Sequence, residues 1–209
     1  MTKRVAKEMT DVMKHLTVAD VRLAAIIKSV GAYEIKLRKD PFQSLVEAII
    51  YQQLAGSAAD AIYRRFVKIY GRFPRPAQLL ATKDFKLRDA GLSARKIEYL
   101  KDLASRVSDG RLKLTLLPKL PDEQVIEQLV QVKGIGRWTA EMFLIFCLGR
   151  QDVLPVGDFG LRKAMQKAYL LGEPPSPATM SDIAQVWKPY CSIATWYLWK
   201  SLEKFKGIG

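Results

Sequence analysis

The sequence predicts an all-helical protein. Apolar residues recur at helical spacing along most of the 209-residue chain, which is the pattern of helices with one buried face. Helix-capping signals precede several of these stretches, as at Asp40-Pro41, Ser93 and Asp158. Strand signals are almost absent: only 112–117 partly alternates between apolar and polar side chains, and it is too short to found a sheet.

Composition limits the classes of protein to which the chain can belong. Its 49% hydrophobic content is ordinary for a globular protein, and 209 residues suffice for one substantial core or for two lobes that share a cleft. Lys and Arg total 34 against 21 for Asp and Glu, a formal net charge of +13. This excess suits a polyanion such as nucleic acid, because each neutralised phosphate releases counterions. Charge alone is equally compatible with a protein that is merely basic.

Nothing in the sequence predicts a membrane segment or an export signal. No stretch approaches the roughly 18 consecutive apolar residues of a membrane-spanning helix, and the N-terminus lacks the apolar centre of a signal peptide. We therefore expect no membrane partner and a protein that stays in the compartment where it is made.

The first third of the chain predicts three helices. Thr17 and Asp20 resemble a capping box, and the basic residues before Thr17 are expected to be mobile. Pro41 suits the first position of a helix that Asp40 caps. The predicted bounds are 17–30, from Asp40-Pro41 to Gln52, and from Ser57 to Gly71.

Shorter helices follow and lead to a helical hairpin. Ser93 is a candidate N-cap for a helix with regular apolar spacing. The predicted helices are a short one after Pro76, one over 82–90, one from Ser93 to Val107, and the first hairpin helix after Pro121.

A Gly-x-Gly turn joins the two predicted helices of the hairpin. Gly134 and Gly136 can both take positive φ and carry no side chain, so another molecule can approach the backbone closely. Their amides, with those that open the next helix at Trp138 and Thr139, form an expected anion-binding concavity, for which phosphate is the natural ligand. This second helix, predicted over 138–148, is apolar on nearly every face and is expected to run through the interior.

An apolar run over 153–156 delivers Asp158 to the start of the next predicted helix, which continues to Leu171. Asp158 is therefore a candidate N-cap. The remaining predicted elements are a rigid, proline-rich loop over 172–177 and final helices over 187–192 and 193–199.

Cysteine and histidine are too few for a disulfide framework or a zinc site. Cys147 and Cys191 are the only cysteines, and both lie in apolar helical patterns where a buried, reduced thiol is expected. The single histidine, His15, lies in a polar N-terminal stretch and is expected on the surface. No metal is required.

Two motifs together resemble a known family. The sequence Gly-Ile-Gly-Arg-Trp-Thr-Ala-Glu over 134–141, followed by Leu-Pro-Val-Gly-Asp over 154–158, is similar to the helix-hairpin-helix DNA glycosylases with a Gly/Pro-rich loop and an aspartate, the HhH-GPD superfamily. Within that superfamily the chain looks like the DNA-3-methyladenine glycosylase II branch. The resemblance covers most of the chain, and its Trp-Thr-Ala and Leu-Pro-Val signatures are highly specific, whereas a Gly-x-Gly pair alone would not be.

The resemblance implies a single domain, 1–209, made of two helical lobes around a cleft. The lobe with the hairpin (122–148) is expected to cover about 44–148, and the other is expected to join about 1–43 to about 149–209. Some members carry an additional N-terminal β-domain, which is not expected here.

The residues permit hydrolysis of an N-glycosidic bond, with Asp158 as the candidate catalytic residue. Cleavage develops positive charge on the sugar, so a fixed carboxylate beside the anomeric carbon stabilises the transition state and can orient or deprotonate water. Considered without its neighbours, Asp158 is better explained as a helix cap. The glycine hairpin precedes it at the distance found in the family motif, and this favours the catalytic role. Glu141, Asp152 and Asp40 are expected to be solvated or capping.

Relatives that also cut the DNA strand use a lysine on the second hairpin helix to form a Schiff base. The matching position here is Trp138, and Lys133 does not match that lysine. The resemblance therefore implies a monofunctional glycosylase that leaves an abasic site.

An extruded base needs a pocket with aromatic walls, and a positively charged alkylated purine is held there by cation–π stacking. Trp138 and Trp199 match aromatic pocket positions of the family, and Met142 and Phe159 match positions where relatives carry tyrosine. As an alternative, all four are ordinary core residues, and we prefer that alternative for Met142. Cys191 stands where the family pattern has arginine, so any contact of that arginine is missing or replaced.

The resemblance also implies contacts with DNA beyond the hairpin. Gln53 and Leu54 are candidates to fill the space left by the extruded nucleotide; without the resemblance they would be surface and core residues, respectively. The wedge that enters the opened minor groove matches Ala94, which is small for the task, so Leu92 or Leu54 is the alternative.

Two further groups follow from the resemblance. The backbone carbonyls of Val130, Val132 and Ile135 match a site for a monovalent cation that bridges to phosphate. The four-cysteine iron–sulfur cluster of some relatives is not expected, because two cysteines cannot supply its ligands. No other cofactor is expected.

The sequence thus predicts a monofunctional DNA glycosylase of base excision repair that flips alkylated bases out of double-stranded DNA and hydrolyses their glycosidic bond. The chief expected base is 3-methyladenine, with 7-methylguanine and 1-methyladenine as further candidates. The alternatives are a catalytically silent helix-hairpin-helix DNA-binding protein and a glycosylase for oxidised or mismatched bases. We expect a monomer in the cytoplasm or nucleoid, or in the nucleus if the source is eukaryotic.

Overall fold

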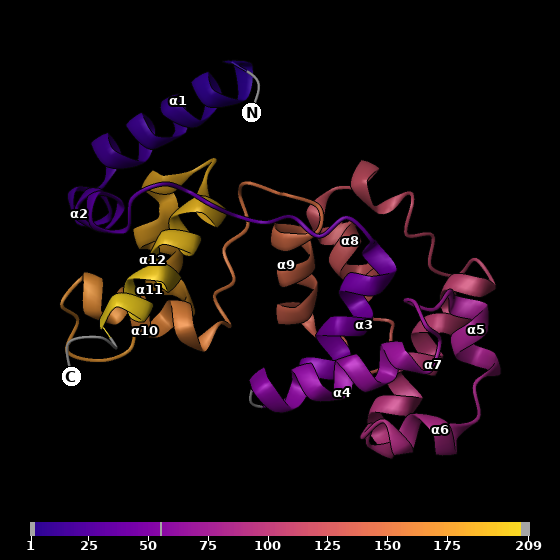
Figure 1. Cartoon of the computed structure of the whole chain (residues 1–209). Coiled ribbons are helices and arrows are strands. Elements are labelled where there is room, and N and C mark those ends of the chain that lie inside the picture. The colour runs from indigo at the N-terminus through magenta and orange to yellow at the C-terminus, as the bar shows by residue number, and fades with distance from the viewer. Residues whose placement is uncertain (1–2, 55, 206–209) are drawn as a thin grey trace. The chain divides into compact units, whose positions relative to one another are not determined.

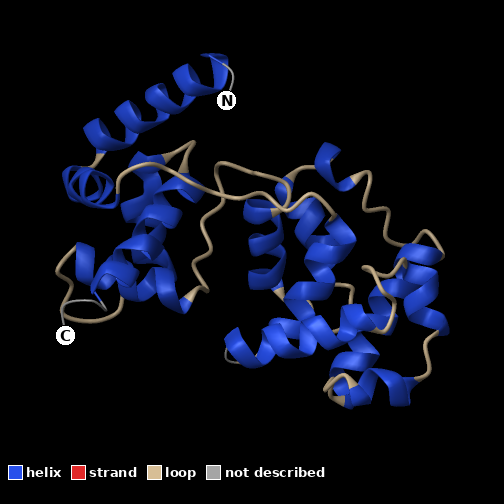
Figure 2. Ribbon diagram, viewed as in Figure 1, coloured by secondary structure: helices blue, strands red, loops and turns tan. Residues whose placement is uncertain are grey.

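The computed structural model describes residues 3–54 and 56–205, with side chains described for 9–54 and 56–202. All regular structure in these residues is helical (Figure 1, Figure 2), so the all-helical prediction is confirmed for them. The segment over 112–117 forms turns that lead into a short 3₁₀-helix, η1 (Leu117–Lys119), and not a strand.

The chain divides into two compact units. One joins Met1–Lys36 to Gly149–Gly209, and the other is Leu37–Leu148. The first and last segments of the chain therefore fold together. The boundaries expected from the sequence lie at about 44 and 149, and those of the structure lie at 37 and 149.

The first unit is built around its last helix. That helix packs against α2 and α10, and α1 packs against α2 and η2. Its core fully buries the large side chains of Trp187 and Tyr197, together with Leu16 and Leu23 from the N-terminal helices. The elements are α1 (Lys3–Ala19), α2 (Val21–Val30), α10 (Phe159–Ala168), α11 (Pro177–Ala184), η2 (Gln185–Trp187) and α12 (Cys191–Phe205).

Two helices stand where the sequence predicts one over 17–30, so that prediction is wrong. Thr17 lies in the last turn of α1, and its hydroxyl donates to the carbonyl four residues earlier (2.8 Å) instead of capping a helix. Asp20 has extended backbone (φ −145°) and is the N-cap of α2, where it accepts two backbone amides. The burial of Val12 and Leu16 in the core explains why α1 extends before Thr17.

The Asp20 carboxylate ties the N-terminal helices to the C-terminal part of this unit. Its Oδ2 accepts hydrogen bonds from Trp187 Nε1 (2.8 Å) and from the Tyr169 hydroxyl. Burial alone raises the pKa of this carboxyl, but the hydrogen bonds from Trp187, Tyr169 and the amides of Leu23 and Arg22 outweigh burial and hold its pKa below the usual value.

His15 and Cys147 differ from their expected exposure. His15 is half-buried because α1 packs onto the core, and its ring lies edge-to-face against Tyr190 with centroids 5.4 Å apart. Cys191 is buried as expected, whereas Cys147 is half-buried. Both thiols are free, and burial raises the pKa of each.

The second unit surrounds α3 and α7. α7 packs against α3, α5 and α6, while α3 also packs against α4 and α9. The predicted N-caps are confirmed: Asp40 accepts the amide of Gln43 (2.9 Å), and Ser93 accepts that of Lys96 (3.3 Å). The helices are α3 (Pro41–Tyr51), α4 (Gly56–Lys68), α5 (Pro76–Ala81), α6 (Asp84–Asp89), α7 (Ala94–Ser108), α8 (Asp122–Leu129) and α9 (Arg137–Phe146).

Several helix ends differ from their predicted positions. α9 ends at Phe146 instead of residue 148, and α10 ends at Ala168, shortly before Leu170 takes a positive φ of 55°. α11 is a helix that is not predicted from the sequence, and Ser176 caps it by accepting the Thr179 amide (3.1 Å). α12 runs without a break through the position predicted to separate two helices.

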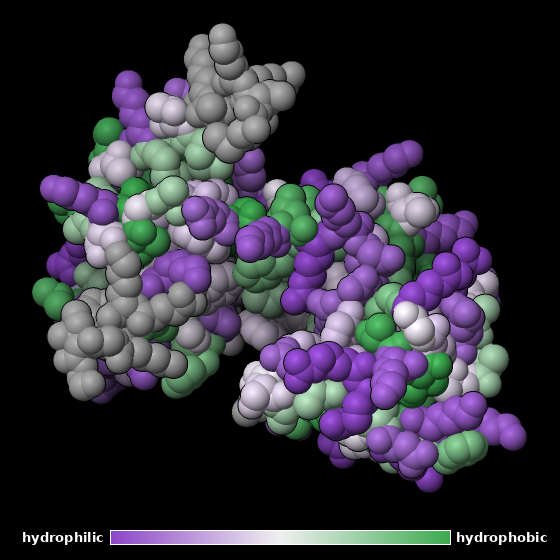
Figure 3. Space-filling model, in the orientation of Figure 1, coloured by the Kyte–Doolittle hydropathy of each residue, from purple (hydrophilic) through white to green (hydrophobic). Residues whose placement is uncertain are grey.

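The surface of the described residues is mixed. Each helix in this part of the chain is too short or too polar to cross a membrane. On the face drawn in Figure 3, hydrophilic side chains cover most of the second unit, and hydrophobic side chains lie between them in separate patches.

Replacing Asp20 with asparagine is expected to destabilise the protein by about 2 kcal/mol at neutral pH. The variant keeps an oxygen for the helix cap but turns an amide donor toward the Trp187 and Tyr169 donors. Because the folded-state pKa lies below the unfolded-state pKa, the stabilisation is complete above the unfolded pKa and is lost as pH falls through the folded pKa. The difference in free energy of unfolding from wild type, measured by urea denaturation, should be largest near pH 7 and shrink below about pH 4.

Asp84→Asn is the matched control, because that carboxylate is exposed and pairs with Lys101 at the surface. Its effect on unfolding should be much smaller. A small effect of Asp20→Asn at neutral pH, or one that does not decrease on acidification, would contradict the role assigned to Asp20.

Candidate active site

The turn between α8 and α9 requires glycine at position 134. Gly134 has a φ of 81°, in the left-handed region. An added Cβ would lie 2.1 Å from Cδ2 of Tyr99, so the Tyr99 ring occupies the space that a side chain would need. Backbone conformation and close packing therefore both exclude other residues here.

Gly136 behaves differently from its prediction. Its φ of −94° and ψ of 173° are ordinary extended backbone, so the expectation of a positive φ is wrong for this glycine. It is the N-cap of α9, no side chain caps this helix end, and nothing lies within 4 Å of an added Cβ. The first-turn amides of a helix have no intrahelical acceptor, so this open end suits an anion.

Neighbouring segments hold the turn from two sides. The Gln52 side chain donates from Nε2 to the carbonyl of Gly134 (2.8 Å). On the α7 side, Asp102 accepts the backbone amide of Lys133 (2.9 Å), and the Lys133 ammonium pairs with Glu98 (2.5 Å). The turn is thus fixed to both the end of α3 and the face of α7.

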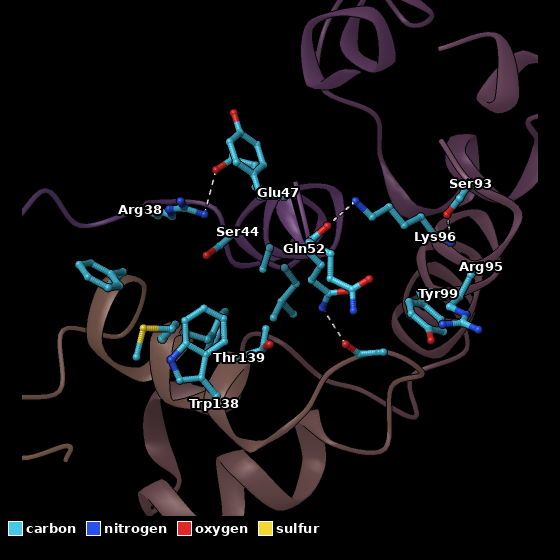
Figure 4. A pocket seen from close by; sticks show the side chains of 18 residues that line it. Arg38, Ser44, Glu47, Gln52, Ser93, Arg95, Lys96, Tyr99, Trp138 and Thr139 are labelled. Carbon is cyan, nitrogen blue, oxygen red and sulfur yellow. Dashed lines mark hydrogen bonds and ion pairs between the residues drawn. The ribbon is translucent and has the colours of Figure 1, made fainter. Parts of the chain in front are cut away.

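A cavity of about 720 Å³ lies beside this turn, lined by residues of α3, α7 and α9 (Figure 4). This volume is in the range of small-molecule sites. Trp138 and Met142 line it together with Thr139 and Gln53, so the structure brings these four predicted residues to one cavity. Trp138 is 46% exposed, so the expectation that its helix is buried on nearly every face is wrong at this residue, although most of the helix is buried.

The opposite wall of the cavity is polar and contains residues that are not predicted from the sequence. Arg38 pairs with Glu47 of α3 (2.9 Å), and Gln43 donates to the same carboxylate (3.0 Å). Lys96 lines the cavity from α7, and burial lowers the pKa of its ammonium. Gln43 and Glu47 are neighbours on α3, and Arg38 comes from the loop before that helix, whereas Lys96 reaches this wall only because α7 packs against α3.

Asp158 belongs to the first unit and caps α10, as predicted. Its Oδ1 accepts the amide of Leu161 (2.5 Å) and the indole Nε1 of Trp199 (2.8 Å), and the side chain is half-buried. Two donors on one oxygen restrict the orientation of the carboxylate. A carboxylate held in this way can stabilise positive charge without first reorganising.

Gly160 allows Trp199 to reach the carboxylate. An added Cβ at position 160 would lie 3.2 Å from Asp158 Oδ1 and 3.5 Å from Cδ1 of Trp199. The distance to Asp158 is shorter than most Cβ contacts. Phe159, directly after the aspartate, is 78% exposed. Gly160 is not among the residues predicted from the sequence, although a glycine two residues after a candidate catalytic aspartate is a usable signal.

The candidates for DNA insertion occupy two loops. Gln53 is exposed, with a φ of 56°, and Leu54 is 39% exposed, so interpreting Leu54 as a core residue is wrong. Ala94 is exposed at the first position of α7. Leu92 is 3% exposed, so the alternative that assigns the wedge to Leu92 is wrong.

The other carboxylates are mainly structural. Glu141 is buried and pairs with Arg137 (3.2 Å), so its expected solvation is wrong. Asp152 accepts the amide of Cys191 at the start of α12 (3.3 Å), which is a capping role. Their contacts explain both residues without a catalytic function.

The predicted cation site stays a prediction. Val130, Val132 and Ile135 lie in the segment that leads into the glycine turn, and the Val132 carbonyl accepts the amide of Ile135 (3.0 Å). A carbonyl oxygen has two lone pairs, so this bond is compatible with a cation ligand.

Comparison with known proteins gives a consistent result. A family model described as "HhH-GPD superfamily base excision DNA repair protein" matches residues 46–189. The curated DNA-3-methyladenine glycosylase 1 of Schizosaccharomyces pombe is 36% identical over 211 residues, covering 95% of this chain and 90% of that protein.

Solved structures are similar as well. A DNA-3-methyladenine glycosidase of Bacillus halodurans has a TM-score of 0.86 and 41% identity, covering 94% of this chain and 91% of that one. A 3-methyladenine DNA glycosylase of S. pombe in complex with abasic DNA has a TM-score of 0.83 and 35% identity, covering 92% of this chain and 97% of that one.

Alanine substitutions of the two hairpin glycines should have unequal effects. Gly134→Ala combines positive φ with a clash against Tyr99 and is expected to cost about 2 kcal/mol or more of unfolding free energy. Gly136→Ala meets open space in an ordinary conformation, and is expected to cost about 1 kcal/mol or less as a poorer N-cap. Urea denaturation of both variants checks this, and equal losses would show that the turn does not depend on the approach of Tyr99.

Proposed function

The chain belongs to the HhH-GPD superfamily of base excision DNA repair proteins, and we propose that it is a monofunctional DNA glycosylase that removes alkylated bases, chiefly 3-methyladenine. The observation that carries the proposal is the orientation of Asp158, which the Leu161 amide and the Trp199 indole fix at the start of α10. The likeness to 3-methyladenine glycosylases at 35–41% identity over more than nine-tenths of this chain supports the substrate class.

The chemistry is a displacement by water at the anomeric carbon of the sugar. The bond from carbon to the base nitrogen breaks, and its electron pair neutralises the positive charge of a cationic alkylated purine. The sugar becomes cation-like in the transition state, and the Asp158 carboxylate stabilises that charge. Water then adds to the carbon and loses a proton, for which Asp158 is the candidate base. The products are a free base and an abasic site.

The reaction ends at the abasic site. Strand cleavage through a Schiff base needs an amine nucleophile on the second hairpin helix, and the residue that matches it is Trp138. An indole carries no such amine. The enzyme is therefore a hydrolase without lyase activity.

The base is bound through an aromatic surface. Trp138 presents nearly half of its surface beside the cavity of the second unit, and a positively charged purine stacks favourably on an indole. Met142 lines the same cavity and adapts to a ring of varying shape. We assign Trp199 and Phe159, beside the aspartate, to the same function. Because stacking of a cationic ring on an indole does not depend on which atom is methylated, 7-methylguanine and 1-methyladenine remain further candidates.

Binding to double-stranded DNA uses the hairpin and the net charge of +13. The open amino end of α9 at Gly136 receives a phosphate, and Gly134 and Thr139 shape that site. Gln53, Leu54 and Ala94 are the candidates that occupy the space left by the extruded nucleotide. We further propose that the protein is a monomer and needs no iron–sulfur cluster. Backbone carbonyls near Val132 are proposed to bind a monovalent cation, and the protein is proposed to act in the compartment that holds the DNA.

Asp158→Asn should strongly reduce base release while DNA affinity persists. Asparagine caps helices as well as aspartate does, so α10 is retained and the negative charge is lost. We expect the rate of base release from methylated duplex DNA to fall by about 10²–10⁴-fold. Chromatographic measurement of free bases, with DNA affinity measured by fluorescence anisotropy, tests both statements.

The same assay, run also with a duplex that contains 8-oxoguanine, separates the alternatives. A catalytically silent DNA-binding protein gives no release with wild type, and a glycosylase for oxidised bases releases 8-oxoguanine instead of methylated purines. Equal release by wild type and Asp158→Asn would overturn the proposed mechanism.

Trp199→Phe should reduce base release by about tenfold, because it removes one hydrogen bond to the catalytic carboxylate and keeps an aromatic ring. Trp196→Phe is the matched control: it makes the same change one turn earlier in α12, where the indole packs against Tyr33. Single-turnover rates with saturating enzyme should fall for Trp199→Phe and stay near wild type for Trp196→Phe. Similar rates for the two variants would exclude a role for the Trp199 indole.

A further inference from the structure

Lys96 makes an unusual set of contacts for a lysine near the protein surface. From the first turn of α7, its ammonium donates to the carbonyls of Ile50 (2.6 Å) and Gln52 (2.8 Å), at the C-terminal end of α3. Figure 4 shows Lys96 reaching toward Gln52. None of the ion pairs of the described residues includes Lys96. The cation therefore binds the negative end of a helix, where it satisfies carbonyls without an intrahelical partner.

Gln52 links this helix end to the hairpin turn. The backbone carbonyl of Gln52 accepts a hydrogen bond from the Lys96 ammonium, and its side-chain amide donates one to the carbonyl of Gly134 (2.8 Å). Tyr99, one turn after Lys96 on α7, lies against the backbone of Gly134. The end of α3, the start of α7 and the hairpin turn thus form a closed triangle of contacts.

The next residue after this triangle is strained and exposed. Gln53 has a φ of 56°, which residues other than glycine seldom adopt, and Leu54 follows with 39% of its surface exposed. Such a conformation persists when the surrounding structure fixes the chain on at least one side. Here Gln52 is fixed through both its carbonyl and its side chain.

We propose that Lys96 is a positioning residue: by holding the end of α3, it keeps Gln53 and Leu54 in the conformation that fills the DNA stack, and connects that loop to the phosphate-binding hairpin. This inference rests on the proposed function, because Gln53 and Leu54 act only on a duplex from which a base has been extruded. The Lys96 ammonium is bonded to the carbonyls of Ile50 and Gln52, so its proposed role is exerted through the chain that it holds. Its effect is on base extrusion and not on general affinity for DNA.

The test compares the rate of base release with the affinity for undamaged DNA in Lys96→Met. Methionine keeps most of the apolar stem and removes the charge and the donors. The single-turnover release of 7-methylguanine from a duplex, at saturating enzyme, should fall about tenfold, as expected for loss of charged hydrogen bonds. Affinity for the undamaged duplex should change less than about threefold, because the hairpin amides remain.

Two further variants make the result specific. Gln52→Met removes the side-chain contact with Gly134 and should likewise lower the release rate while leaving the affinity for undamaged DNA nearly unchanged. This variant tests the proposal even where Lys96→Met fails to fold. Lys101→Met is the control, since it removes the same charge from α7 at a surface ion pair with Asp84, and should leave the release rate unchanged.

Each outcome has a distinct meaning. A wild-type protein that releases no 7-methylguanine or 3-methyladenine overturns the proposed function. A wild-type protein that is active, with Lys96→Met and Gln52→Met at wild-type rates, overturns the positioning role. Loss of affinity for undamaged DNA equal to the loss of rate also overturns it, because Lys96 would then be an ordinary phosphate contact.

Discussion

The second unit depends on the space that Gly134 leaves empty. Because residue 134 has no side chain and a positive φ, the Tyr99 ring lies directly against the hairpin backbone. The Gly134 carbonyl accepts a hydrogen bond from the side-chain amide of Gln52. A larger residue would separate α7 from the turn. Three segments far apart in the sequence meet at this point, so the wall of the cavity beside Trp138 is fixed by contacts from three directions.

The first unit uses the same physical device for a different purpose. Gly160 leaves room for the Trp199 ring, whose indole then donates to the carboxylate of Asp158. In both units a glycine near the start of a helix, or just before it, admits an aromatic ring to a functional group. The Tyr99 ring restricts motion of the hairpin turn in the second unit, and the Trp199 ring restricts motion of the Asp158 carboxylate in the first. Restricted groups need little reorganisation when charge develops or a ligand binds.

Features with a local cause could be predicted from the sequence. The caps at Asp40, Ser93 and Asp158 are correct because an N-cap bonds to an amide three residues ahead, within the same segment. Features with a distant cause could not. The helix that precedes Thr17, the burial of Leu92 and the exposure of Leu54 all follow from which side chains reach a core built by other segments.

By itself, the sequence determined that the chain is helical, that it carries a glycine hairpin and a capping aspartate, and that its motifs resemble one family of DNA repair enzymes. Only the tertiary structure decided that Trp199 reaches Asp158 across 41 positions, and that Lys96 holds the end of α3 across 44. The physical reason is that periodicity and capping act within a helix, whereas a hydrogen bond between helices depends on how they pack and leaves no regular spacing in the sequence.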